Sequence, residues 1–224
     1  EIGTSWVVDS FNTMIDFVNN NDGQDFIDGI SDYINVPRAI DSMLYTWAIH
    51  ANDNTSKNIL WATYDGVHWT PSVYDMDGTW GCFYNGDMTT VNTNAWKPHT
   101  GNALWAKIFN NMQNEVVERW NQLRQGPLSI QNIDQHFVDF YKTIPSKLYE
   151  CERQKWEAVP SQYTNHVTQI VNWATEYLHN MDISMGLDLN EQAGYKISIE
   201  TDEHIQVRAY LSSDYSHDPN LTSI

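Results

Sequence analysis

HANDNTSKNILWATYDGVHWTPSVYDMDGTWG, residues 50–81, is the stretch that decides the fold. Residues 59–64 and 67–74 within it are rich in the β-branched and aromatic types that favour strands. Only Asp65-Gly66 separates the two runs, and this dipeptide is typical of a two-residue type I′ turn. We therefore predict an antiparallel hairpin in which the chain folds straight back on itself.

The predicted hairpin brings two polar loops together at its open end. Asn58 precedes the first arm and Asp75 follows the second, at similar distances from the turn. Because antiparallel pairing sets the start of one arm beside the end of the other, we expect Asn58 and Asp75 to lie about 5 to 10 Å apart. The same loops also carry Asp53, Lys57 and Asp77.

These residue types fit the chemistry of phosphoryl transfer at a kinase-like site. In such a site one carboxylate orients the acceptor hydroxyl, while an amide and a second carboxylate hold Mg²⁺ against the nucleotide phosphates. Asp53 and Asn58 have the D-x-x-x-x-N spacing of a kinase catalytic loop, and Asp75 lies where a D-F-G-like segment would. Asp and Asn are also ordinary turn residues, so a purely structural role for Asp53 and Asn54 stays open.

The stretch also resembles the spore-coat protein H (CotH) kinase family, whose members are atypical, secreted or surface-associated kinases. The residues that carry the resemblance are Asp53, the pair Lys57-Asn58, and the segment Asp75-x-Asp77-x-Thr79-Trp80-Gly81. It extends more loosely over residues 6–185. In the sequence given, no glycine-rich segment and no strand-borne lysine precedes Trp6, so we expect only the C-terminal, C-lobe-like part of a kinase.

The resemblance implies a role for each matching residue. Asp53 is expected to be catalytic, and Asn58, Asp75 and Asp77 are expected to bind Mg²⁺ and, through it, ATP. We expect Lys57 to neutralise a phosphate in transit. The implied partners are a nucleotide and a protein substrate or coat partner, and the implied location is a spore surface, a cell surface, the outside of the cell or a virion.

Two other functions compete with the kinase hypothesis. Asp75-x-Asp77-Gly78-Thr79 after an apolar strand also opens haloacid-dehalogenase-type phosphatases, with Asp75 as nucleophile and Asp77 as general acid. That fold needs a parallel doubly wound sheet, whereas we predict that this strand is one arm of a hairpin. The second competitor is a non-catalytic structural or attachment module of a spore-coat, cell-surface or phage-tail protein. An EF-hand is excluded because loop positions 6 and 12 are Trp80 and Gly86.

Composition limits the partners. A formal charge of −17 over 224 residues argues against nucleic acid and anionic membrane, because both need a basic surface. No apolar run approaches the roughly 18 residues of a membrane span. Two cysteines, Cys82 and Cys151, are too few for a disulfide framework.

Apolar residues at helical spacing predict helices over most of the remaining chain. The predicted ranges are 6–18, 24–34, 37–50, 102–124, 130–144 and 164–181, and another helical segment contains Leu148, Cys151 and Trp156. Gly126-Pro127 is expected to stop the fourth of these helices and Ser129 to cap the fifth, and we interpret His50 at the end of the third as a capping or packing residue. The stripes of these helices, including Ile15, Phe140, Leu148, Cys151 and Trp156, are predicted to be core. Residues 82–100 are expected to form a long loop, and alternation from Tyr195 predicts two strands. We thus predict a mainly α domain with a small hairpin over residues 1–185, followed by a linker and β appendage over 186–224.

Overall fold

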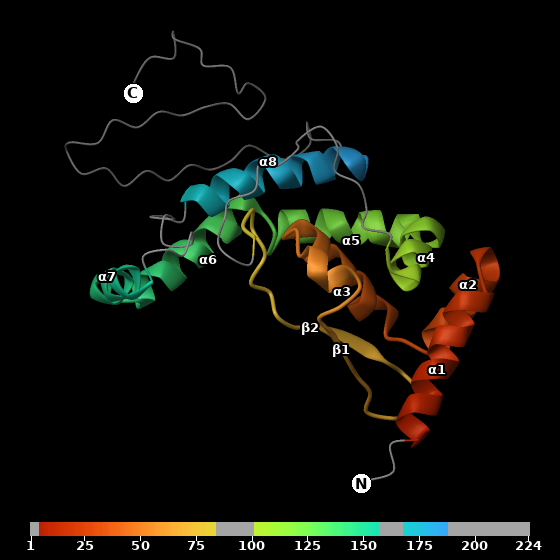
Figure 1. The fold of residues 1–224 in the computed structure, drawn as a ribbon. Helices are drawn as coiled ribbons and strands as arrows, with labels where there is room; N and C mark the ends of the chain where they lie inside the picture. Colours follow the sequence, from red (N-terminus) through yellow and green to blue (C-terminus); the bar gives the residue numbers. More distant parts are fainter. Residues whose placement is uncertain (1–4, 84–100, 157–167, 188–224) are drawn as a thin grey trace. The chain divides into compact units, whose positions relative to one another are not determined.

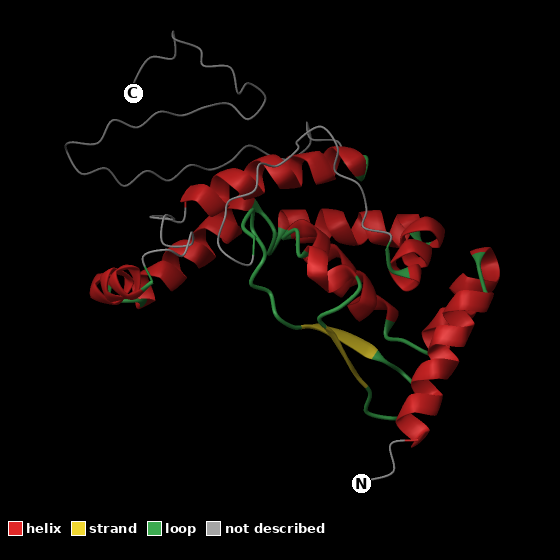
Figure 2. Cartoon of the chain, viewed as in Figure 1, coloured by secondary structure: helices red, strands yellow, loops and turns green. Residues whose placement is uncertain are grey.

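The computed structural model describes residues 5–83, 101–156 and 168–187. All of them belong to one compact unit, Glu1–Gln192. They form helices and one two-stranded antiparallel sheet (Figure 1; Figure 2). The predicted mainly α fold with a small hairpin is therefore confirmed.

Helix α1 (Ser5–Asn20) packs along one stripe, with Met14 and Val18 buried. The prediction that Ile15 faces the core is wrong, because Ile15 is 38% exposed. The stripe passes through Met14 instead, one position around the helix. The negative end of α1 is neutralised by Lys107, whose Nζ donates to the carbonyl oxygens of Val18 and Asn21, each at 2.5 Å.

After α1, Asp22 caps helix α2 (Gly23–Gly29), which runs directly into a 3-10 turn, η1 (Ile30–Asp32). Phe26 and Ile30 are fully buried, as the predicted second helix required. The predicted end of that helix is too long, because Ile34 leaves the helical path to form an isolated bridge with Trp69.

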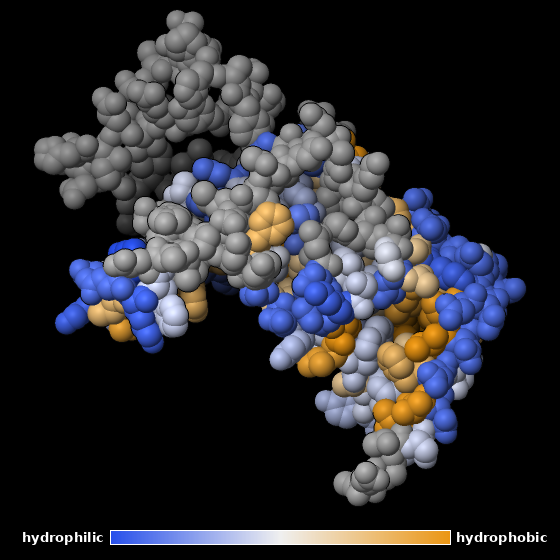
Figure 3. All heavy atoms as spheres, viewed as in Figure 1, coloured by the Kyte–Doolittle hydropathy of each residue, from blue (hydrophilic) through white to orange (hydrophobic). Residues whose placement is uncertain are grey.

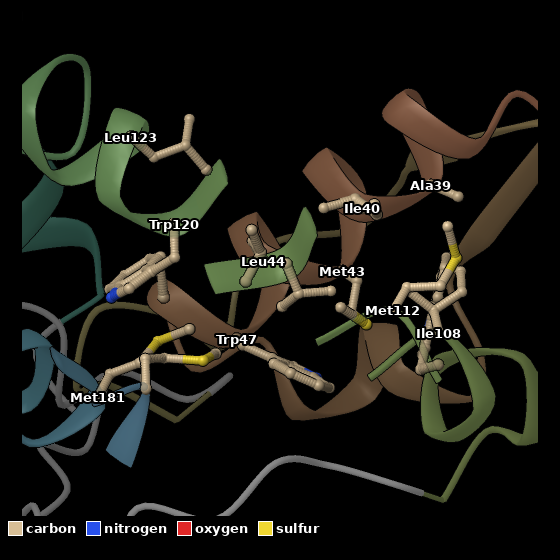
Figure 4. Close-up of a cluster of buried hydrophobic side chains, with 14 of the residues drawn as sticks. Ala39, Ile40, Met43, Leu44, Trp47, Ile108, Met112, Trp120, Leu123 and Met181 are labelled. Atoms are coloured by element: carbon tan, nitrogen blue, oxygen red, sulfur yellow. The ribbon is translucent and has the colours of Figure 1, made fainter. Parts of the chain in front are cut away.

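Helix α3 (Val36–Ala48) lies at the centre of the core. Asn35 caps its start by accepting a hydrogen bond from the Arg38 N–H at 3.1 Å, and Pro37 fills the first turn, where its missing N–H is not needed. The helix contacts strand β2, helix α5 and helix α8. Figure 4 shows its side chains Met43, Leu44 and Trp47 among residues of these helices, and all three are fully buried as predicted.

Strands β1 (Ile59–Ala62) and β2 (Thr70–Val73) form the predicted antiparallel pair, with Ile59 opposite Val73 and Ala62 opposite Thr70. The predicted two-residue turn is wrong, because residues 63–69 connect the strands. Asp65 organises this connection by accepting hydrogen bonds from the N–H groups of Val67 and His68, at 2.9 and 2.8 Å.

Trp69 explains why the pairing stops short of the turn. Its N–H donates to the Tyr33 carbonyl at 2.8 Å, and its carbonyl accepts from Asn35 at 3.0 Å, so its backbone pairs with the α2–α3 connection instead of β1. Its ring is buried and lies edge-on to Phe11 at 5.0 Å. Burial of the indole against α1 therefore decides where the hairpin ladder ends.

The single helix predicted over residues 102–124 is two helices, α4 (Ala103–Asn111) and α5 (Gln113–Gln125). Met112 between them has φ −120° and ψ 41°, outside the helical region. Ile108 before the break and Val116 after it are both fully buried. The break redirects the second helix without exposing the apolar stripe, so periodicity alone does not reveal it. Gly126 ends α5, as predicted.

Helices α6 (Ile130–Thr143) and α7 (Ser146–Lys155) follow. Ser129 caps α6 as predicted, and Ile133 is buried. Several residues that we predicted to be core are exposed, so that prediction is wrong: they are Phe140 (64%), Leu148 (57%), Trp156 (48%) and Cys151. Helix α7 buries no residue among those described, although Tyr149 stacks on Tyr141 of α6 with ring centroids 5.1 Å apart. Figure 3 shows hydrophobic residues exposed among hydrophilic ones where this helix lies.

Helix α8 (Thr168–Ser184) is the last described element, and it packs against α3 and α6. Its residues Ala174 and Leu178 are buried as predicted, while the predicted start at residue 164 lies outside the described residues. The residues beyond 187, with the predicted linker and strands, and most of the loop predicted over 82–100 also lie outside them. Among the described helices, none is long and apolar enough to cross a membrane.

A buried ion pair joins α5 to α8. The Nε of Arg124 donates to both carboxylate oxygens of Asp182, at 2.9 and 3.1 Å, and the Trp120 indole N–H donates to the same carboxylate at 2.9 Å. Arg124 Nη1 donates to the Leu128 carbonyl, which holds the guanidinium in place. Sequence analysis assigned no polar role to these helices, so this pair was missed.

Candidate functional site

The first loop of the site, residues 52–58, begins with a 3-10 helix, η2 (Asn52–Thr55), at the end of α3. Asp53 and Lys57 form an ion pair there, with 2.8 Å between the carboxylate and Nζ. Their side chains are 63% and 64% exposed, so both groups are open to a ligand from solvent.

The pKa of Lys57 depends on carboxylates of both loops. The hydrogen bond and the charge of Asp53 raise the pKa of Lys57, and the charges of Asp75 and Asp77 raise it further. Opposite charges favour the charged ammonium, and between exposed groups this effect fades over about a Debye length, roughly 10 Å at 0.1 M salt. The structure therefore brings Asp53, Lys57, Asp75 and Asp77 into one electrostatic neighbourhood.

The acidic loop, residues 74–79, meets the first loop at the open end of the hairpin. The Tyr74 N–H donates to the Asn58 carbonyl at 3.1 Å, one position beyond the Ile59–Val73 pair. Asn58 thus bonds to the residue that precedes Asp75, just beyond the paired ends of β1 and β2. The backbone juxtaposition that we predicted for these two residues is present, although the turn at the other end differs.

Both residues have a strained backbone. Asn58 has φ 56° and Asp75 has φ 57°, and His50 (φ 58°) and Trp80 (φ 55°) complete the set of non-glycine residues with positive φ among those described. Such conformations are sterically unfavourable, and they cluster at functional sites when the surrounding structure holds them. All four occur within residues 50–80 and bracket the two loops.

The buried side chain of Asn54 connects the two loops. Its side chain is 2% exposed, and its Nδ2 donates to the Asn58 carbonyl at 2.9 Å and to the Tyr74 carbonyl at 2.7 Å. Sequence analysis considered Asn54 only as a turn residue and missed this role. An asparagine beside the first carboxylate gives little warning of it, because the acceptor on Tyr74 is twenty residues away.

Local bonds also shape the acidic loop. The Asp77 carboxylate accepts from the Gly78 N–H at 2.9 Å, and the Thr79 hydroxyl donates to the Met76 carbonyl at 3.0 Å. These contacts fold residues 76–79 into a turn that leaves the Asp75 and Asp77 side chains exposed. The D-x-D-x-T pattern is therefore explained in part by the turn that it forms.

Trp80 and Gly81 anchor this loop to the core. The Trp80 N–H donates to the Ile49 carbonyl at 2.9 Å, and its ring lies edge-on to Phe137 at 5.1 Å. Gly81 has φ 81°, and a Cβ built there would lie 2.3 Å from the Trp173 ring. Only glycine fits this position, since it needs both a left-handed backbone and a close approach to the indole.

His50, which sequence analysis interpreted as a capping or packing residue, lies against aromatic rings of α8. Its imidazole is 5.3 Å from the Tyr177 ring and 6.2 Å from the Trp173 ring. Its N–H donates to the Trp47 carbonyl at 3.1 Å, so it ends α3 with its backbone. These contacts agree with the packing interpretation.

The oxygen atoms available in the two loops suit a hard cation. Asp75 and Asp77 provide carboxylates and Asn58 an amide, and Mg²⁺ is usually held by one or two carboxylates together with substrate phosphates and water. No group of three or more His, Cys, Asp or Glu side chains that could hold a metal occurs in the part of the chain described. A cation at these two loops would therefore need further ligands, such as phosphate oxygens or water, beside the oxygen atoms of Asn58, Asp75 and Asp77.

The strand that leads to Asp75 also bears on the phosphatase alternative. It is β2, paired antiparallel with β1 in a sheet of two strands. The parallel sheet on which a haloacid-dehalogenase-type site is built is not found among the described residues. The local sequence match to that signature thus occurs in a different structural setting.

The comparisons with known proteins agree with this picture. A family model described as CotH kinase protein matches residues 1–181. The match spans both loops of the site and the helices that support them. Neither the search of curated proteins nor that of solved structures found a match.

Proposed function

We propose, since the chain belongs to the CotH kinase protein family, that its two loops form the site of a phosphotransferase that uses Mg²⁺-ATP and a protein hydroxyl acceptor. The observation that carries this proposal is the meeting of the two loops: the exposed Asp53–Lys57 pair lies within the field of Asp75 and Asp77, and Asn58 adjoins Asp75 across the hairpin.

Asp53 has the exposure needed to orient an acceptor. In the proposed reaction its carboxylate accepts a hydrogen bond from the acceptor hydroxyl and takes up the proton as the hydroxyl oxygen bonds to phosphorus. The bond between the transferred phosphorus and the bridging oxygen breaks, and ADP leaves with the bond's electron pair. Lys57, paired with Asp53 at 2.8 Å, is flexible enough to turn towards a phosphate oxygen instead.

Asn58, Asp75 and Asp77 are the residues that would hold Mg²⁺. When bound, the ion supplies positive charge that offsets the charge of the phosphates. This local source of positive charge matters here because the whole chain carries a formal charge of −17, which repels a free nucleotide. The left-handed backbone at Asn58 and Asp75 would then be part of the local structure that presents these residues to the ion.

Calorimetry tests the metal role directly. ATP is titrated into the chain with and without Mg²⁺, and Asp75→Asn is compared with Asp9→Asn, which removes one exposed aspartate from α1. We expect Mg²⁺-dependent heat for the unchanged chain and for Asp9→Asn, and a loss of at least tenfold in affinity for Asp75→Asn. Equal binding by both variants would remove Asp75 from the metal site.

A phosphotransfer assay with radiolabelled ATP and a generic protein acceptor tests the catalytic role. We expect incorporation of label that Asp53→Ala abolishes while leaving nucleotide binding intact. Binding of Mg²⁺-ATP without transfer, or neither, would support the alternative of a non-catalytic spore-coat, surface or phage-tail module. A phosphoenzyme at Asp75 with hydrolysis of a phosphomonoester would support the phosphatase.

A further inference from the structure

The side chain of Asn54 is a buried connection between the two loops, and its orientation is unambiguous. Both neighbours of its terminal group, the carbonyls of Asn58 and Tyr74, can only accept hydrogen bonds, so the nitrogen must face them. A primary amide has two N–H donors, and here each has its own acceptor. The amide is thereby satisfied despite its burial.

The two carbonyls belong to the peptide units that adjoin the strained residues. The Asn58 carbonyl lies in the peptide plane after Asn58, and the Tyr74 carbonyl lies in the plane before Asp75. Because Asn58 and Asp75 both have left-handed backbones, each needs an external contact to hold it. Holding these two planes constrains the backbone on one side of each residue, and so limits the directions that its side chain can take.

Other contacts at the open end do not duplicate this connection. The Tyr74 N–H bonds to the Asn58 carbonyl and so joins the strands, but it leaves the Tyr74 carbonyl to Asn54. The Asn54 N–H in turn donates to the Ala51 carbonyl at 3.0 Å, which ties the residue to the end of α3. The end of α3, the first loop and the acidic loop therefore meet at one residue, through its backbone N–H and its side chain.

We propose that Asn54 is a positioning residue for the nucleotide-metal site: its amide holds Asn58 and Asp75 in the arrangement that binds the cation, without touching the ligand itself. This inference rests on the proposed function. Residues that orient metal ligands from behind typically change metal affinity by 10- to 100-fold when they are removed. We therefore expect a loss of affinity from a residue that is inaccessible to the metal.

The experiment compares Asn54→Leu with a matched control, Thr46→Val. Leucine keeps the number and branching of the side-chain heavy atoms of asparagine and removes both donors. Thr46 is also 2% exposed, and its hydroxyl contacts the carbonyls of Ser42 and Met43 at 3.0 and 2.9 Å within α3, away from the loops. The control thus loses buried hydrogen bonding without affecting the loop connection.

Two properties are measured on the whole chain. The first is affinity for Mn²⁺ in the presence of a non-hydrolysable ATP analogue, followed by electron paramagnetic resonance of the free ion. The second, measured without metal, is the NMR coupling between amide and α protons of Asn58 and Asp75, which reports φ. We expect Asn54→Leu to weaken Mn²⁺ binding at least tenfold and to change both couplings. We expect Thr46→Val to change the affinity for Mn²⁺ by no more than twofold and to leave both couplings unchanged.

The outcomes separate this inference from the proposed function. Mn²⁺ binding that Asn54→Leu leaves unchanged, or that both variants weaken equally, would overturn the positioning role. Failure of the unchanged chain to bind Mn²⁺ would instead contradict the proposed function. The couplings would then still show whether Asn54 holds the backbone of Asn58 and Asp75 in place. Should Asn54→Leu fail to fold, hydrogen exchange of the Asn54 side-chain amide in the unchanged chain decides: rapid exchange contradicts the inference.

Discussion

Two ion pairs of the same chemistry occupy opposite environments in this molecule. Asp53 and Lys57 meet at 2.8 Å with side chains 63% and 64% exposed, whereas Asp182 and Arg124 meet at 2.9 Å with side chains 1% and 4% exposed. The exposed pair is screened by water and can exchange its partner for a ligand. The buried pair has no such freedom, so it serves the fold while the exposed pair is available for chemistry.

Breaking the buried pair is expected to have the largest effect on the free energy of unfolding. Arg124→Met leaves the Asp182 carboxylate buried with the Trp120 indole N–H as its hydrogen-bond donor among the described residues, and we expect a loss of about 3 to 5 kcal/mol in the free energy of unfolding. Urea denaturation followed by tryptophan fluorescence measures it.

The control for this prediction replaces both partners, as Arg124→Met with Asp182→Leu. Because burial raises the pKa of Asp182, the folded protein already disfavours the lone carboxylate, and removing it should recover much of the lost stability. A double variant as unstable as the single one would show that lost packing, and not the unpaired charge, causes the effect.

The exposed site nevertheless depends on buried contacts, one of which is the close approach of Gly81 to Trp173. Gly81→Ala adds a left-handed alanine and a contact of 2.3 Å with Trp173, which together should cost about 2 to 4 kcal/mol of unfolding free energy. Thermal unfolding followed by circular dichroism measures the change.

Gly186 supplies the matched control for this substitution. It also has positive φ, 72°, but a Cβ there meets no atom within 4 Å. Gly186→Ala should therefore cost only the backbone strain, about 1 to 2 kcal/mol. Equal losses for the two variants would contradict the role given to the Trp173 contact.

The two regions also differ in how far sequence predicts them. Local signals were sufficient for the hairpin and for two helix starts, marked by Pro37 in the first turn of α3 and by Ser129 before α6, because such residues act over a few positions. The turn and the break at Met112 depend on what packs against them, such as Trp69 against α1. Periodicity likewise identifies an apolar stripe but not whether another element packs against it, so it did not predict that Phe140 and Leu148 are exposed.

The candidate site shows the same division. The motif residues could be found because their spacing along the chain is fixed, and the antiparallel pairing then places Asn58 beside Asp75. Asn54 and the Arg124–Asp182 pair could not be found, because each joins residues far apart in sequence. Long-range polar contacts of single side chains leave no periodic pattern to detect.

Breaking the exposed pair should have a much smaller effect on stability. Lys57→Met removes the ammonium from Asp53, and we expect the unfolding midpoint in urea to stay within experimental error of the unchanged chain. Nucleotide binding in the presence of Mg²⁺ should weaken in the same variant. A clear loss of stability would show that this pair also supports the fold.

The smallest expected effect is also the most direct test of whether the two loops meet. The pKa of Lys57 is raised above the ordinary value of a lysine, first by Asp53 and then by Asp75 and Asp77, because each carboxylate favours the charged ammonium. The stability that this pairing adds is therefore fully present below the unfolded pKa and is lost as pH rises through the folded pKa. NMR titration of the Lys57 side chain should show the midpoint falling most in Asp53→Asn and less in Asp75→Asn. Asp9→Asn should leave it unchanged, and an Asp75→Asn midpoint identical to that of the unchanged chain would mean that the acidic loop lies too far from Lys57 to share a ligand with it.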